Sequence, residues 1–113
     1  MSATIPVVRK NDLVIQELDN EILIYDLQNN KVFGLNETSA LVWQLSDGEK
    51  TISEIAYEAS KKLNSSINEE FVWFALEQLK KENLVENGSL ETSPFKAMKR
   101  RGVIRKVGLI SLI

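Results

Sequence analysis

The stretch that decides the fold is NNKVFGLNETSALVWQL, residues 29–45, because a strand pattern passes directly into a helix pattern there. Residues 31–35 form a short apolar run with no obvious protection of its edge. Asn36 is a favourable N-cap, since its side-chain oxygen can accept a hydrogen bond from a free amide of the first helical turn. The stretch therefore predicts a strand over 31–35 and a helix from there to about Leu45, with Gly48 available to end it.

Two further strand patterns precede this stretch. Residues 12–18 and 21–27 are β-rich runs separated by Asp19 and Asn20, which tolerate positive φ and so suit a two-residue turn. The second run is apolar on both faces, which is typical of a central strand. With a second turn over 28–30, the pattern predicts a three-stranded antiparallel meander whose third strand, 31–35, lies at one edge.

Helical signals follow the meander. Residues 51–54, TISE, form a capping box before an apolar series at helical spacing, and residues 66–69, SINE, offer another before a helix over about 68–82. Asn83 can take the left-handed position after that helix. We expect an α+β fold resembling a winged helix-turn-helix, in which a three-stranded antiparallel sheet is followed by a three-helix bundle. The expected divisions are an N-terminal arm (1–12), the domain (13–90) and a C-terminal tail (91–113).

The composition argues against catalysis. The 113-residue chain has no cysteine and no histidine, which removes thiol chemistry, thiolate metal sites and the commonest general base. Tyr25, Asp26, Lys31 and Glu37 form no constellation and are interpreted as solvated surface residues. We expect no catalytic, cofactor or metal site. The N-terminus does not resemble a secretory signal and no apolar run is long enough to span a bilayer, so the expected location is cytoplasmic.

Charge is distributed unevenly along the chain. Residues 1–90 carry 8 Lys/Arg against 15 Asp/Glu, a net charge of −7, whereas residues 91–113 carry 6 against 1, a net charge of +5. An acidic body, with four glutamates and two lysines on the third helix, argues against nucleic-acid binding. Three interpretations of the tail stay open: it is disordered, it is a basic segment that contacts an acidic partner or a membrane surface, or it occupies a peptide groove of its own domain.

The third helix carries more apolar residues than one core face requires. Val72, Ala75, Leu76 and Leu79 form an ordinary core stripe, while Ile67, Phe71, Phe74 and Gln78 form a second stripe about 120° around the helix. Two interpretations of the second stripe stay open. Either both stripes lie in the core, or Phe71 and Phe74 line a groove beside the edge strand. Trp73 falls on neither stripe, and we expect it to cover the domain or the tail.

The chain resembles the small PqqD-like proteins, whose fold is also called the RiPP recognition element, RiPP denoting a ribosomally made, post-translationally modified peptide. The resemblance is carried by the ordered pattern EILIYDLQNNKVFGLNETSALVWQLSDGEKTISEIA at 21–56 followed by EEFVWFALEQLKKENLVE at 69–86. It covers roughly residues 13–87. No single motif within it is specific by itself.

This resemblance implies a non-catalytic protein that binds the leader segment of a precursor peptide. The leader would add as a strand to the sheet's third strand and lie against the third helix, and the protein would present it to a modifying enzyme such as a radical-SAM protein, cyclodehydratase, protease or cyclase. The implied peptide-binding residues are Lys31, Val32, Phe33, Gly34, Leu35, Phe71, Phe74, Ala75 and Gln78. Positions 71 and 74 are more usually polar or acidic in the family, so this groove would be more apolar.

Physical arguments support the same site and leave alternatives. An exposed edge strand is normally blunted by charge, proline or a bulge, and this one has only Lys31 at its start. Gly34 removes a side chain where a second backbone could approach, or it marks a bulge before the first helix. The remaining functional alternatives are an assembly subunit of an enzyme complex without a peptide site, and a winged-helix DNA-binding regulator.

Overall fold

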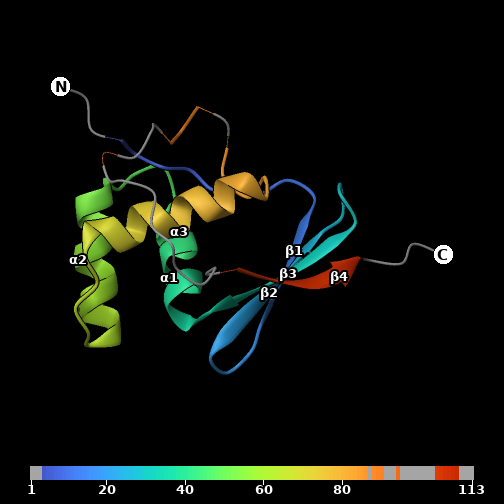
Figure 1. Ribbon diagram of the computed structural model, residues 1–113, viewed down its shortest axis with the longest axis horizontal. Coiled ribbons are helices and arrows are strands. Elements are labelled where there is room, and N and C mark those ends of the chain that lie inside the picture. Colours follow the sequence, from blue (N-terminus) through green and yellow to red (C-terminus); the bar gives the residue numbers. More distant parts are fainter. Residues whose placement is uncertain (1–3, 87, 91–93, 95–103, 110–113) are drawn as a thin grey trace.

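The computed structural model of the chain describes residues 4–86, 88–90, 94 and 104–109. Figure 1 shows the sheet and the helices side by side, with α1 lying next to the sheet. The elements in chain order are β1 (Leu13–Glu17), β2 (Glu21–Asp26), β3 (Lys31–Asn36), α1 (Glu37–Leu45), α2 (Ile52–Leu63), α3 (Glu69–Lys81) and β4 (Ile104–Leu109).

The predicted antiparallel meander is confirmed, with β2 in its centre. Ile24 of β2 lies opposite Ile15 of β1 and opposite Phe33 of β3. The turn between β1 and β2 is closed by the Leu18 amide, which donates to the Glu21 carbonyl at 2.8 Å. This turn forms without the positive φ that we expected at its two central residues, whereas the second turn does use a left-handed residue, Asn30 at φ 55°.

A fourth strand extends the sheet beyond the predicted meander. The strand order is β1-β2-β3-β4, and β4 runs antiparallel to β3 from Leu35↔Ile104 to Lys31↔Leu109. The prediction that β3 forms the edge of the sheet is therefore wrong for this structure, because the C-terminal segment supplies a strand that local sequence patterns did not indicate. The register shifts between Val32 and Phe33, which leaves Val107 of β4 without an opposite residue.

The first two helices begin where their caps were predicted. The Ser39 amide donates to Asn36 Oδ1 at 2.8 Å, and the capping box of Thr51 and Glu54 is formed in both directions. The third helix is capped by Asn68 rather than by Ser66, because the Phe71 amide donates to Asn68 Oδ1 at 2.8 Å. These bonds satisfy amides that have no intrahelical partner.

The ends of α1 and α3 lie close to their predicted positions. Helix α1 ends at Leu45, as predicted, and the hydroxyl of its C-cap Ser46 donates to the Val42 carbonyl at 2.8 Å. Asn83 takes the left-handed conformation after α3, with φ 63°, as predicted. The arrangement of a three-stranded meander followed by three helices confirms the α+β class, and the likeness to a winged helix stays a prediction.

One apolar core joins the sheet to all three helices. Ile22 and Ile24 of β2 face the helices together with Phe33 and Leu35 of β3, and the last three are fully buried. Helix α1 contacts β2, β3 and both other helices, so it forms the centre of the layer. Burial of each such side chain stabilises the domain by about 1.5–3 kcal/mol relative to exposure.

The segment before β1 is part of this packed unit. Val7 forms an isolated β-bridge with Asp47, and Val8 forms one with Val85. The Val8 amide donates to the Ser46 carbonyl and the Arg9 amide donates to the Leu84 carbonyl, both at 3.0 Å. Residues 6–9 therefore connect the loop after α1 with the chain that follows α3.

Candidate functional site

The candidate site is built on β3, whose position is fixed by its inward-facing side chains. Phe33 and Leu35 are fully buried against the helices, and Lys31 is half-buried at the start of the strand. Gly34 is buried opposite Leu23 in an uninterrupted ladder with β2. The bulge considered at Gly34 is not present in that ladder, and the irregularity lies on the β4 side instead. The anchored face holds the main chain of β3 in place for strand pairing.

The outer side of β3 pairs with β4 in this structure. Gly34 lies opposite Arg105 and Phe33 lies opposite Lys106. Of the three interpretations of the tail, this pairing agrees with the one in which the C-terminal segment lies along its own domain. The remainder of the tail falls outside the described residues, apart from Pro94. Residues 31–35 thus accept a strand on the side away from β2, and here the chain itself supplies that strand.

The predicted residues of α3 divide between the core and its margin. Ala75 is fully buried, whereas Phe71 and Phe74 are half-buried and pack against the core cluster. Gln78 is also half-buried. The second stripe of α3 is therefore neither wholly interior nor wholly exposed. Phe33 of β3 and Ala75 of α3 belong to the same core cluster, but the main packing partners of α3 are α1 and α2.

Trp73 belongs to the interior. Only 7% of its surface is exposed, and it joins the core cluster together with Trp43. The Trp43 indole Nε1–H donates to the Leu84 carbonyl at 3.2 Å, which ties α1 to the chain after α3. Trp73 falls outside both predicted stripes of α3, yet it is buried, because neighbouring elements cover this helix over a wider arc than one stripe.

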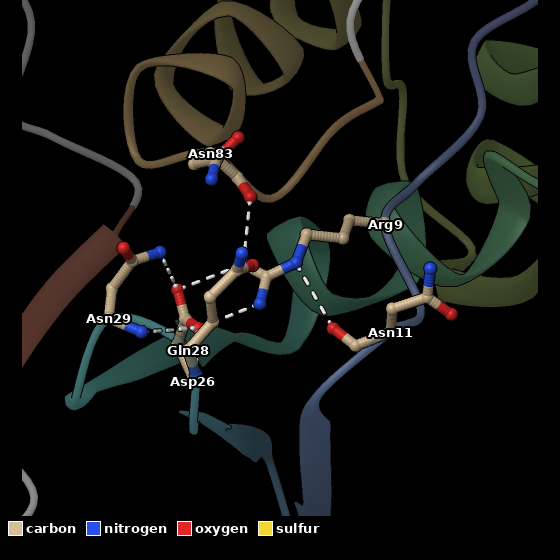
Figure 2. Close-up of polar contacts among 6 residues, drawn as sticks. All are labelled: Arg9, Asn11, Asp26, Gln28, Asn29 and Asn83. Atoms are coloured by element: carbon tan, nitrogen blue, oxygen red, sulfur yellow. Dashed lines mark hydrogen bonds and ion pairs between the residues drawn. The ribbon is translucent and has the colours of Figure 1, made fainter.

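A buried ion pair that the sequence did not reveal lies at the end of β2 (Figure 2). Arg9 Nη1 and Nη2 donate to the two carboxylate oxygens of Asp26 at 2.9 and 2.8 Å. Arg9 also donates to the Asn83 carbonyl at 3.2 Å and to the Asn11 carbonyl at 3.1 Å. Asp26 further accepts from both nitrogens of Asn29 and from the Gln28 amide. The interpretation of Asp26 as a solvated surface residue is wrong, because it is fully buried.

The pKa values of Asp26 and Arg9 are shifted in the directions that keep both side chains charged, as in a structural ion pair. Hydrogen bonding to Arg9 holds the pKa of Asp26 well below its ordinary value against the opposing effect of burial, and the Asn29 hydrogen bonds add to the lowering. The same hydrogen bond raises the pKa of Arg9. Both groups therefore stay charged, and the bidentate geometry links the arm, β2 and the end of α3. A sequence signal for the pair was weak, since 17 positions separate the two residues.

Within the described residues, no group of three or more histidine, cysteine, aspartate or glutamate side chains is arranged to hold a metal ion. Among the helices of the described chain, none has the length and apolarity needed to cross a membrane.

Comparison with known proteins identifies the family. The sequence profile described as Coenzyme PQQ synthesis protein D (PqqD) matches residues 21–85, which include β2, β3 and all three helices. Searches of the curated proteins and of the solved structures found no match. Because the matched region exceeds half of the 113 residues and contains the anchored strand and the helices packed on it, the chain belongs to the PqqD family.

Proposed function

We propose that this protein binds the leader segment of a ribosomally synthesised precursor peptide and presents it to a modifying enzyme. The leader adds as an antiparallel strand to the outer side of β3, along Lys31–Leu35. Residues of α3 contact the leader's side chains. The protein itself carries out no chemistry.

The pairing between β3 and β4 is the observation that carries this proposal. It supports the idea that the outer side of β3 has the geometry to accept a strand from outside the meander, since β4 comes from a distant part of the chain. Strand addition draws affinity from main-chain hydrogen bonds and therefore demands little of the guest's sequence. That property suits a protein that must hold one part of a peptide while an enzyme modifies another.

The margin of α3 supplies the selectivity in this proposal. Phe71 and Phe74 pack against the core yet keep part of their surface exposed, and Gln78 lies one turn beyond Phe74. In this proposal the guest reaches these two half-buried rings, which favour a guest with bulky apolar anchors. Each anchor that covers one of these rings contributes hydrophobic stabilisation in proportion to the apolar area removed from water.

Family membership supports the accessory role. Proteins of the PqqD family are non-catalytic accessory components that work with a biosynthetic enzyme and a peptide partner. For this chain we propose an enzyme of the kinds that modify such peptides: a radical-SAM protein, a cyclodehydratase, a protease or a cyclase. DNA binding is disfavoured, since α3 and its C-cap carry more acidic than basic residues: Glu69, Glu70, Glu77 and Glu82 against Lys80 and Lys81.

The test is an NMR titration of the isotope-labelled full chain with a synthetic leader of the precursor encoded in the same operon. We expect amide shift changes concentrated in residues 31–35 and 71–79. An unchanged spectrum at saturating peptide would contradict the proposal. If the modifying enzyme bound the chain in that case, the protein would instead be an assembly subunit without a peptide site.

Matched aromatic variants sharpen this test. Phe71→Ala and Phe74→Ala each remove a ring at the proposed contact, and we expect the leader's dissociation constant to rise by roughly 5- to 30-fold, equivalent to about 1–2 kcal/mol. Tyr57→Ala is the control, because this aromatic side chain on α2 is 63% exposed and lies on another helix. Equal losses in all three variants would argue against a contact on α3.

A further inference from the structure

We propose that β4 (residues 104–109), here called the resident strand, blocks the outer side of β3. An incoming peptide, the guest, must displace this strand before it can bind. The inference rests on the proposed use of that edge and adds a competitor encoded in the same chain. The outer side of β3 is then occupied when no guest is present. The apparent affinity of a guest peptide depends both on its own contacts and on the stability of the resident strand's pairing.

The register identifies the occupied main chain. All five residues of the proposed pairing stretch, Lys31 to Leu35, have a partner in β4. A second strand cannot pair with the same side of β3 while β4 is in place, because each main-chain amide and carbonyl there points toward one neighbour only. Binding of a guest by strand addition and pairing of β4 are therefore mutually exclusive.

The connection to the domain favours occupancy by the same molecule. Residues 91–103 separate Leu90, which is buried in the core cluster, from the first residue of β4. These 13 residues tether β4 covalently to the domain whose edge it pairs with. Short connections of this kind give an effective concentration in the millimolar range, which a free peptide rarely reaches. Opposite net charges, −7 for residues 1–90 and +5 for residues 91–113, act in the same direction.

An irregularity in the pairing of β4 with β3 makes the resident strand easier to displace. Its ladder with β3 is interrupted between Val32 and Phe33, where Val107 has no opposite residue. A bulge leaves the extra residue unpaired and disturbs the neighbouring hydrogen bonds. A guest that pairs with β3 in continuous register avoids this defect. It can therefore replace β4 without making stronger side-chain contacts than β4 makes.

The occupancy also indicates the class of guest that competes best. The resident segment IRKVGL combines apolar residues with two cations, and it lies on a domain whose first 90 residues are acidic. A guest of the same chemistry, apolar and basic in an extended run, has the same electrostatic advantage. A strongly acidic segment would be repelled by the body of the domain.

The experiment uses full-length variants and a peptide of known sequence. Arg105→Pro with Lys106→Pro removes two successive amide donors, and one of them must face β3 because successive amides of a strand point to opposite sides. Arg105→Gln with Lys106→Gln loses the same two charges but keeps both donors, so it is the matched control. The probe is a synthetic peptide of residues 102–111, GVIRKVGLIS, added to each chain.

We expect the proline variant to bind this peptide at least about 10-fold more tightly than the glutamine control, as for a site that the resident strand occupies at least about 90% of the time. Amide hydrogen exchange within residues 31–35 should be faster in the proline variant without peptide. Equal peptide affinity of the two variants, or absence of binding together with unchanged exchange, would overturn the proposal. Protection of residues 31–35 that falls on dilution would also overturn it, since a second copy would then supply the strand.

These outcomes separate the inference from the proposed function. If the 102–111 peptide binds the proline variant but the operon's leader does not, the resident strand stands and the assignment of its natural competitor fails. If the leader binds the wild-type chain and the proline variant equally well, the leader site stands and the resident strand does not block it.

Discussion

Substitution of Asp26 by asparagine tests the structural role of the buried ion pair. The change leaves the shape of the side chain but removes its charge, while the Arg9 side chain remains 10% exposed with its charge unpaired. Breaking a buried pair in this way costs about 3–5 kcal/mol, a large part of the 5–15 kcal/mol typical of a domain. With about 4–8 °C per kcal/mol for a domain of this size, the melting temperature should fall by at least about 12 °C.

Urea unfolding followed by tryptophan fluorescence measures this effect. Both tryptophans, Trp43 and Trp73, are only 7% exposed in the folded chain, so their emission should change strongly when the core opens. The free energy of unfolding of Asp26→Asn should be lower than that of the wild type by the stated amount at neutral pH. A loss below about 1 kcal/mol would refute the reasoning, because it would give the pair the value of a surface contact.

The pH dependence gives an independent check of the same contact. The pKa of Asp26 is lower in the folded chain than its ordinary value of 3.8, so the pair's contribution is fully present above that value and is lost as the pH falls below it. The stability difference between wild type and Asp26→Asn should therefore be constant from neutral pH down to about 4 and should narrow below it. Arg9, whose pKa is raised, stays charged throughout this range.

A double variant distinguishes a coupled pair from two separate contributions. Arg9→Met with Asp26→Leu removes both charges, and replacement of a buried pair by apolar residues is often neutral or stabilising. We expect this double variant to be more stable than either of its single variants, Arg9→Met and Asp26→Leu. Additive losses in the double variant would mean that the two side chains act independently.

Three further predictions concern local geometry. Thr51→Ala removes the cap of α2 and should lower the free energy of unfolding by about 1 kcal/mol in urea titrations, with Ser53→Ala, one position inside the helix and exposed, as the control. Asn83→Ala should cost about 1–2 kcal/mol because alanine resists the left-handed φ of 63°, whereas Asn83→Gly should leave the melting temperature within a few degrees of wild type. Deletion of Val107 should regularise the ladder between β3 and β4 and slow amide exchange in residues 31–35, and faster exchange would contradict the assigned register.

The parts of the fold that the sequence predicted are those determined by neighbouring residues. The step from β3 into α1, the capping box at Thr51 and the left-handed Asn83 each depend on a few consecutive positions. Their signals are local because a cap or a turn satisfies backbone groups within one helical turn. The family resemblance rested on the ordered sequence of these same signals, and the family match confirmed it.

The parts that the sequence did not predict depend on contacts between distant segments. Arg9 and Asn83 are 74 positions apart, and β4 pairs with a strand about as far away along the chain. A charged residue near the N-terminus and an aspartate at a strand end are ordinary surface residues by composition, and only the folded geometry brings them together. The sequence left three interpretations of the tail open. A short apolar and basic run is compatible with a disordered segment, with contact to an acidic partner or a membrane surface, and with a place in the peptide groove of its own domain.

The Arg9–Asp26 contact has a consequence for how the family's boundaries are used. The matched region begins at residue 21, after β1, and therefore retains the carboxylate of Asp26 while omitting the guanidinium that neutralises it. A fragment trimmed to residues 21–85 would bury an anion without its counter-ion and leave β2 without the strand on its far side. The smallest fragment that we expect to fold by itself is thus longer than the region matched to the family. It must include Arg9 and therefore start before that residue.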